Sequence, residues 1–237
     1  MLIILLTAFV VSLIVTLLMV RNAKAGSCVH DHDLSGPQKF HTAPVARIGG
    51  IGIFVGTLAG VVAIFWRDAA IGRLAALLML CAVPTFVSGL TEDLTKTQSP
   101  RRRLFFTAVS AALAVFLLDG AIRRTDIPGL DWLVATTAGA AIVTVFVVAG
   151  VANSINIIDG FNGLASMCTV LMMASIGYVA FQVNDSLVLA LAVAGAGAVL
   201  GFFVWNFPAG LIFLGDGGAY FLGFYVAELA ILLLQRN

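Results

Sequence analysis

Long apolar stretches alternate with short polar connections along the whole chain. A transmembrane helix needs about 20 apolar residues to cross roughly 30 Å of hydrocarbon. The stretches that approach this length are Leu2–Val20, Ile48–Trp66, Ile71–Leu90, Leu104–Leu118, Trp132–Val151, Leu164–Val183, Leu187–Trp205 and Ala219–Leu234. They lack the strict apolar–polar alternation of barrel strands. The pattern therefore predicts an all-α polytopic bundle of about eight transmembrane helices, with the fourth free to extend to Ile122.

Composition supports an integral membrane protein. The 237 residues are 61% hydrophobic and only 11% charged, whereas soluble domains carry about 25% charged residues. We expect one membrane domain over residues 1–237, with the first stretch a retained anchor because it has no basic n-region. The net charge of +1 gives no reason to expect nucleic-acid binding. Three scattered cysteines, Cys28, Cys81 and Cys168, are expected to be free thiols.

The distribution of Lys and Arg predicts the orientation in the membrane. Loops 21–47 and 91–103 carry eight of these residues, whereas the alternate loops and the C-terminal end carry five. This bias places loops 21–47, 91–103, 152–163 and 206–218 on the cytoplasmic side. Both chain ends would then face outward.

Residues Asn153 to Gly163 form a polar run between apolar stretches. Unsatisfied polar groups in lipid cost several kcal/mol each. Asn153, Asn156 and Asp159 recur every three residues, so on a helix they fan over about 120° of one face. Such a stripe can hold a polar ligand or support a metal ligand. Interhelical hydrogen bonding is the alternative.

Acidic residues lie near predicted helix ends on the cytoplasmic side. They are Glu92, Asp93, Asp159 and Asp216. Carboxylates grouped on one face can bind a divalent cation, although helix capping or solvation is the alternative for any one of them. Gly-Asp-Gly-Gly at 215–218 also opens a helix, where backbone N–H groups suit phosphate oxygens.

The first predicted cytoplasmic loop contains basic residues that could contact phosphate. Lys39, His41 and Arg47 precede Gly49-Gly50, which allows a close backbone approach at the start of a helix. A basic loop held against anionic lipid is the alternative. Upstream in the same loop, a small metal cluster of Cys28, His30, Asp31 and His32 is a less favoured hypothesis.

Taken in order, four segments resemble the polyprenyl-phosphate N-acetylhexosamine-1-phosphate transferases. These segments are Lys39 to Gly50, Gly89 to Leu94, Asn153 to Gly163 and Asn206 to Gly218. The resemblance covers the whole chain. This family, glycosyltransferase family 4, includes the phospho-N-acetylmuramoyl-pentapeptide transferases and the UDP-N-acetylglucosamine-1-phosphate transferases, which initiate peptidoglycan or O-antigen synthesis.

The resemblance implies transfer of a sugar 1-phosphate from a UDP-N-acetylhexosamine to undecaprenyl phosphate, releasing UMP. It implies Mg²⁺, or Mn²⁺ in its place, and a multi-pass protein of the bacterial inner membrane whose site faces the cytoplasm. It leaves a homodimer open. By position, Glu92, Asp93 and Asp159 match catalytic residues, and Asp216 and Asp93 match metal ligands. The matching substrate-binding residues are Lys39, His41, Arg47, Asn153, Asn156 and Asn206.

Two differences from the family's pattern qualify these expectations. The chain has Glu92-Asp93 where the family commonly has Asp-Asp. The family usually has ten or eleven helices and a later His-rich loop, so we expect this chain to be C-terminally truncated relative to it. The alternative functions are an inactive truncated scaffold and a transporter, the latter because Glu228 is an acid within an apolar stretch.

The expected chemistry is attack of one anion on another. A lipid phosphomonoester is already largely ionised at neutral pH, because its second pKa is about 6. Neutralisation and positioning therefore matter more than a strong base. We favour direct transfer with Asp93 orienting or deprotonating the lipid phosphate, and a covalent carboxylate route is the alternative.

Overall fold

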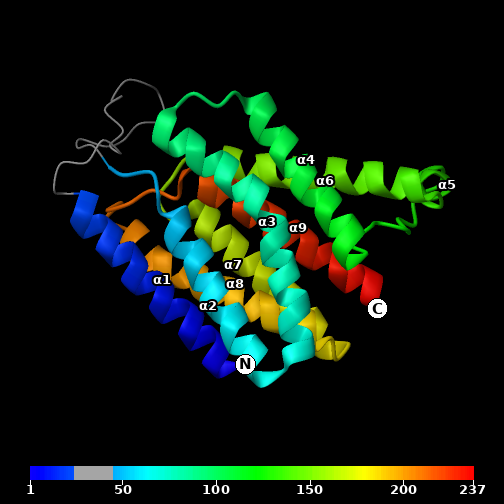
Figure 1. Cartoon of the computed structure of the whole chain (residues 1–237), viewed down its shortest axis with the longest axis horizontal. Helices are drawn as coiled ribbons and strands as arrows, with labels where there is room; N and C mark the ends of the chain where they lie inside the picture. Colours follow the sequence, from blue (N-terminus) through cyan, green and yellow to red (C-terminus); the bar gives the residue numbers. More distant parts are fainter. Residues whose placement is uncertain (24–44) are drawn as a thin grey trace.

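The protein is a bundle of α-helices in a computed structural model that describes residues 1–23 and 45–237 (Figure 1). The described residues contain no β-strand. The helices are α1 (Leu2–Ala23), α2 (Gly50–Arg67), α3 (Ala69–Thr95), α4 (Pro100–Leu118), α5 (Leu130–Val134), α6 (Thr137–Ile158), α7 (Leu164–Gln182), α8 (Ser186–Asn206) and α9 (Gly215–Arg236). The prediction of an all-α bundle is confirmed.

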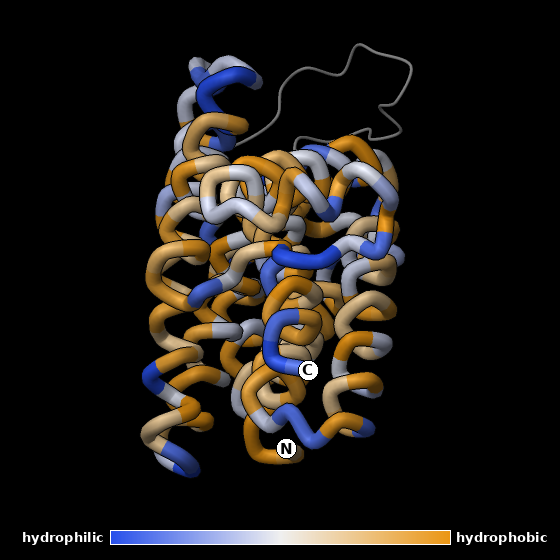
Figure 2. Tube along the Cα trace, turned by 90° about the vertical axis from the view of Figure 1, so that its right-hand side faces the viewer, coloured by the Kyte–Doolittle hydropathy of each residue, from blue (hydrophilic) through white to orange (hydrophobic). Residues whose placement is uncertain are grey.

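Seven of the helices in the described ranges are long and apolar enough to cross a membrane. The eighth long helix, α4, is not among them and carries three arginines in its first turns. Figure 2 shows apolar residues dominating the helices along their length. The chain is therefore a multi-pass membrane protein.

Capping residues shift three of the predicted boundaries. Ser99 caps α4 with its hydroxyl accepting from the Arg102 N–H at 3.4 Å, so this helix starts earlier than predicted. It also ends at Leu118, where Asp119 is left-handed, and the extension to Ile122 was wrong. Thr136 caps α6 in the same way through the Gly139 N–H, so Trp132 lies before the spanning helix rather than in it.

Helix α9 lies at the centre of the bundle. In its most apolar stretch 83% of the residues are buried, against 22–67% in the corresponding stretches of the other six candidate membrane-spanning helices. It packs against α3 and α6 most extensively, with α2, α7 and α4 also in contact. The first turn of α9 is consequently surrounded by protein on several sides.

Small residues let the helices α1, α2 and α8 pack closely. Gly52, Gly56 and Gly60 recur every four residues on α2 and face Ser12, Thr16 and Ala8 of α1 or alanines of α8. A side chain on these glycines would overlap the neighbouring helix, with contacts of 2.1–2.8 Å. In lipid, such small-residue stripes favour helix association because they permit close packing.

Candidate active site

The predicted polar residues gather at one end of the bundle. This end contains the C-termini of α3 and α6 and the N-terminus of α9, and hydrogen bonds join them. Both chain ends lie toward the other end of the bundle (Figure 1). Loops 91–103, 152–163 and 206–218 therefore share a side, as the sequence predicts.

Asp93 joins α3 to the first turn of α9. Its Oδ1 accepts from the backbone N–H of Asp216 at 2.7 Å, and its Oδ2 accepts from that of Gly217 at 2.8 Å. The side chain is buried. The first N–H groups of a helix lack partners within the helix, and the N-terminus carries partial positive charge. Asp93 thus supplies hydrogen-bond acceptors that this helix end requires.

Gly215 permits this contact. Its φ of +74° is in the left-handed region, and a Cβ there would lie 2.1 Å from the Arg47 carbonyl oxygen and 2.7 Å from Asp93 Oδ2. A neighbouring backbone pairing draws the same chain segments together. The N–H groups of Gly49 and Gly50 donate to the carbonyls of Phe213 and Leu214, each at 2.9 Å.

Gly50 and Gly89 allow α2 and α3 to approach α9 closely. A Cβ on Gly50 would lie 2.3 Å from the Gly218 nitrogen, and one on Gly89 would lie 2.7 Å from the Asp216 carbonyl group. The sequence predicts a close backbone approach at Gly49-Gly50. The contact partner is the Gly215–Gly218 turn.

Asp216 is the most connected acidic residue of the site. Its Oδ1 accepts from Asn156 Nδ2 at 2.9 Å, and its Oδ2 forms an ion pair with the Arg103 guanidinium. Three helices, α4, α6 and α9, therefore converge on one carboxylate. The side chain keeps 22% of its surface exposed, so a ligand can reach it.

Tyr220 extends this network one turn further along α9. Its ring lies 5.5 Å from the Arg103 guanidinium carbon, and its hydroxyl donates to Asn153 Oδ1 at 3.3 Å. The predicted stripe thus turns two of its members, Asn153 and Asn156, toward α9. The two positions that they meet, Asp216 and Tyr220, are four residues apart and share a face of that helix.

Asp159 directly follows the last residue of α6. Its carboxyl group interacts electrostatically with the Arg47 guanidinium. Burial raises the pKa of its carboxyl from 3.8 to about 7, because the charged form is poorly solvated, while Arg47 opposes this shift. The carboxyl is therefore partly protonated near neutral pH.

The raised pKa of Asp159 leads us to expect a pH-dependent effect on stability. A raised pKa stabilises the fold at low pH, and this contribution is lost progressively as the pH rises from 3.8, the ordinary pKa of Asp, through about 7. We expect Asp159→Asn to match the unmodified protein at about pH 4 and to exceed its melting temperature by roughly 2–4 °C at pH 8. Thermal unfolding in detergent with EDTA measures this. A stability advantage of the unmodified protein that grows with pH would contradict the raised pKa.

Asn206 and Glu92 have mainly structural contacts. Asn206 accepts from the Gly163 N–H at 2.6 Å and donates to the Ile212 carbonyl at 2.9 Å, which ties the start of α7 to the loop before α9. Glu92 accepts from the Gln98 N–H at 2.5 Å and closes the α3–α4 turn. The substrate-binding role of Asn206 and the catalytic role of Glu92 stay predictions.

Some predicted residues lie outside the described structure, and two residues of the network were not predicted. Lys39 and His41 lie outside the described residues, as does the hypothesised Cys28–His32 cluster. Arg103 and Tyr220, by contrast, belong to the network although the sequence analysis did not single them out as site residues. The spacing of Arg103, Thr107 and Ser110, at i, i+4 and i+7, could have indicated a polar stripe on one face of this helix. In the structure Thr107 and Ser110 are buried.

The side chains of the site offer few carboxylate ligands for a divalent cation. Within residues 1–23 and 45–237, no three His, Cys, Asp or Glu side chains lie close enough to hold a metal ion. Mg²⁺, however, is commonly bound by one or two carboxylates together with substrate phosphates and waters. Asp216 fits such a partial site. Asp93 fits it less well, because it is buried and its oxygens accept from backbone N–H groups, whereas Asp216 is partly exposed and its oxygens contact side chains.

Glu228, which motivated the transporter alternative, is enclosed within the bundle. Its side chain has no exposed surface, and a Cβ on Gly120 would lie 3.1 Å from its Oε2. It follows Asp216 by twelve residues along α9, or about 18 Å. It is therefore remote from the network around Asp216.

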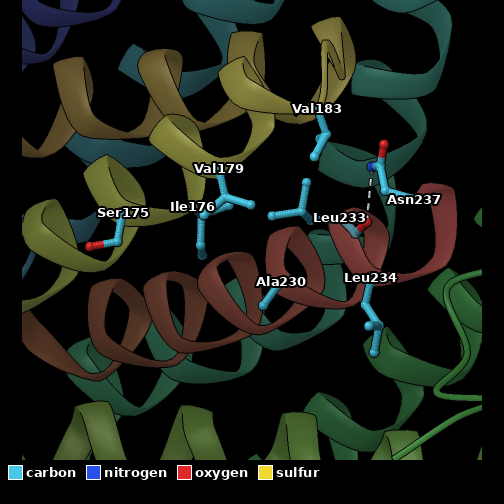
Figure 3. Close-up of a pocket in the computed structure, with 8 residues that line it drawn as sticks. All are labelled: Ser175, Ile176, Val179, Val183, Ala230, Leu233, Leu234 and Asn237. Atoms are coloured by element: carbon cyan, nitrogen blue, oxygen red, sulfur yellow. Dashed lines mark hydrogen bonds between the residues drawn. The ribbon is translucent and has the colours of Figure 1, made fainter.

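An apolar groove separates α7 from α9 away from the network. One cavity of about 460 Å³ is lined by Ile176, Val179 and Val183 of α7 and by Ala230 and Leu233 of α9 (Figure 3). A second cavity of about 500 Å³ shares Ser175 and Ile176 with it. Their almost entirely apolar lining, in which Ser175 and Asn237 are polar exceptions, provides lipid-compatible surface.

Comparison with known proteins identifies relatives. The family model described as Glycosyl transferase family 4 matches residues 75–234, about two thirds of the chain. A Bacillus subtilis (strain 168) protein named "Probable undecaprenyl-phosphate N-acetylglucosaminyl 1-phosphate transferase" is 29% identical over 97% of this chain. A Geobacillus kaustophilus (strain HTA426) phospho-N-acetylmuramoyl-pentapeptide-transferase is 27% identical over 95% of it. The chain spans 63% of the first relative's length and 74% of the second's.

Proposed function

Because the chain belongs to glycosyl transferase family 4, we propose that it transfers an N-acetylhexosamine 1-phosphate from a UDP-sugar to undecaprenyl phosphate. The product is a lipid-diphosphate-linked sugar that initiates synthesis of a cell-envelope glycan, such as peptidoglycan or O-antigen. One observation carries the proposal: Asp93, Asn156 and Arg103 converge from three helices on the Gly215–Gly217 turn.

The proposed reaction is a direct displacement at phosphorus. An oxygen of the lipid phosphate attacks the sugar-linked phosphorus of the UDP-sugar. A new P–O bond forms between the lipid phosphate oxygen and the sugar-linked phosphorus. The P–O bond from that phosphorus to the bridging oxygen breaks, and UMP leaves with the bridging oxygen. Both reactants are anionic, so charge neutralisation and alignment supply most of the catalysis.

Residues of this chain provide those two requirements. The α9 N-terminus presents partial positive charge, and Arg103 and Arg47 add guanidinium groups on the same side. Guanidinium forks match phosphate oxygens in pairs. Asn156 orients Asp216 through its amide, and Asp93 holds the turn that carries Asp216. Asp93 therefore acts as a positioning residue in this proposal.

We propose Mg²⁺, with Mn²⁺ as a substitute, as the cofactor. Asp216 would hold it, and Asp159 in its ionised form would assist. When bound, the cation neutralises pyrophosphate oxygens. Support comes from the chemistry of the donor set, since oxygen ligands with partial exposure suit Mg²⁺.

The apolar surroundings of the site suit a prenyl substrate. Ile157, Phe161 and Leu164 flank Asp159 and expose 72%, 61% and 42% of their surfaces. A prenyl chain can lie against such residues while its phosphate reaches the polar network. The excess of Lys and Arg in loops 21–47 and 91–103 supports a cytoplasmic site in a bacterial inner membrane.

A transfer assay tests the proposed function. Protein purified in detergent receives Mg²⁺, undecaprenyl phosphate and UDP-N-acetylhexosamines carrying label in the sugar. We expect label to enter the lipid fraction and UMP to appear in equal amount, with neither occurring when undecaprenyl phosphate is omitted or EDTA is added. Absence of transfer from every sugar tested, in a protein whose folding is verified by thermal unfolding, would refute the proposal.

A further inference from the structure

Every oxygen of the Asp216 carboxylate already has a partner from this chain. Asn156 donates to Oδ1 at 2.9 Å, and the Arg103 guanidinium pairs with Oδ2. The two charged side chains are 14% and 22% exposed, so this ion pair is largely shielded from water. Arg103 therefore occupies, as a fixed cation, the position where a divalent cation would contact the carboxylate.

Arg103 itself is incompletely satisfied. Its Nε is buried and has no hydrogen-bond partner among the described residues. The guanidinium also lies over the Tyr220 ring, 5.5 Å from the ring centre. A guanidinium in this state retains donors for a phosphate, and a cation–π contact can hold it in place after the Asp216 pair opens.

From these contacts we propose that Arg103 is an internal counter-ion of Asp216 that competes with the divalent cation and is drawn away by the substrate's pyrophosphate. The inference rests on the proposed function for the identity of the cation and the anion. It makes the two ligands cooperative, because the anion frees Asp216 for the cation. Coupling of this kind is reciprocal, so the cation equally frees Arg103 for the anion.

Binding of Mn²⁺ without substrate tests the competition directly. The fraction of free Mn²⁺ is followed by its electron paramagnetic resonance signal, with protein in neutral detergent. Arg103→Met removes the competing charge and nearly preserves the length of the side chain. We expect it to bind Mn²⁺ about tenfold more tightly than the unmodified protein, the size of effect that one neighbouring charge has on an ionisable site.

Three further variants show whether the change in Mn²⁺ affinity comes from the Arg103–Asp216 pair. Arg102→Met alters an exposed neighbour in the same helix turn and should leave Mn²⁺ affinity unchanged. Asp216→Asn should abolish the binding and thereby assign it to this site. Arg103→Gln, whose amide can still donate to Asp216, should also tighten Mn²⁺ binding, and it decides the question if Arg103→Met does not fold.

A second measurement tests the coupling. Equilibrium dialysis of labelled UDP-N-acetylglucosamine with and without Mn²⁺ should show a larger Mn²⁺-induced gain in the unmodified protein than in Arg103→Gln. Mn²⁺ affinity that is equal or weaker in both neutral variants would overturn the inference, as would absence of Asp216-dependent binding. If Mn²⁺ tightens as expected while no sugar phosphate is transferred, the proposed function fails and the ion-pair competition stands.

Discussion

Asp93→Asn is expected to reduce sugar phosphate transfer by roughly 10²–10³-fold and to lower the unfolding free energy by about 2–4 kcal/mol. The carboxylate accepts from two backbone N–H groups, those of Asp216 and Gly217. An asparagine has one acceptor, and its amide group would face the second N–H. The first turn of α9 would lose its anchor, and Asp216 would move away from Asn156 and Arg103. Labelled-lipid assays and thermal unfolding measure the two effects.

Asp185→Asn is the matched control for Asp93→Asn. Asp185 is also a buried aspartate that accepts from two N–H groups at a helix start, those of Leu187 and Val188, and it pairs with Arg236. It caps α8, whose other end carries Asn206. We expect a comparable loss of stability with transfer nearly retained. Equal loss of transfer in both variants would mean that activity merely follows stability.

Gly215→Ala is expected to abolish transfer and to destabilise the fold by about 3 kcal/mol or more, because strain and overlap add. The residue has φ of +74°, which an L-residue adopts with strain, and its Cβ would lie 2.1 Å from the Arg47 carbonyl oxygen. That oxygen belongs to the backbone and cannot rotate away. Relief of the overlap would separate the Arg47 segment from α9. A thermal melt and the transfer assay record both consequences.

Gly150→Ala serves as the control for this substitution. Gly150 lies in α6, and a Cβ there would have no heavy atom of another described element within 4 Å. In a helix interior, alanine is favoured over glycine by about 0.5–1 kcal/mol. This variant should therefore be slightly more stable and fully active. A harmless Gly215→Ala would contradict the close contact between the Arg47 segment and α9.

The spacing of Asn153 and Asn156 was sufficient to predict that they share a face, because helical periodicity is a local property. Their actual partners, Tyr220 and Asp216, come from a segment about sixty residues away. Neither pairing follows from local pattern. Arg103 illustrates the same limit, since it is one of three adjacent arginines in the sequence and only helix packing distinguishes it from Arg101 and Arg102.

Asp93 lies where the sequence predicts a site residue, but its contacts are those of a helix cap. The sequence predicts an acidic residue at the site, and the structure places it there. Its two hydrogen bonds to the α9 backbone, however, assign it the work of a helix cap. The roles of catalyst and metal ligand stay predictions for Asp93, whereas Asp216 remains accessible to a ligand.

The sequence by itself determined the helical membrane class, the approximate spans and the side on which the polar motifs meet. These follow from the length of the apolar stretches and from the cost of polar groups in lipid, which depend on nearby residues alone. Only the tertiary structure decided which carboxylate is a cap, which is paired with Arg103 and which becomes partly protonated. Those outcomes depend on how closely Gly50, Gly89 and Gly215 let three helix ends approach, because burial and hydrogen-bond partners change within a few ångströms.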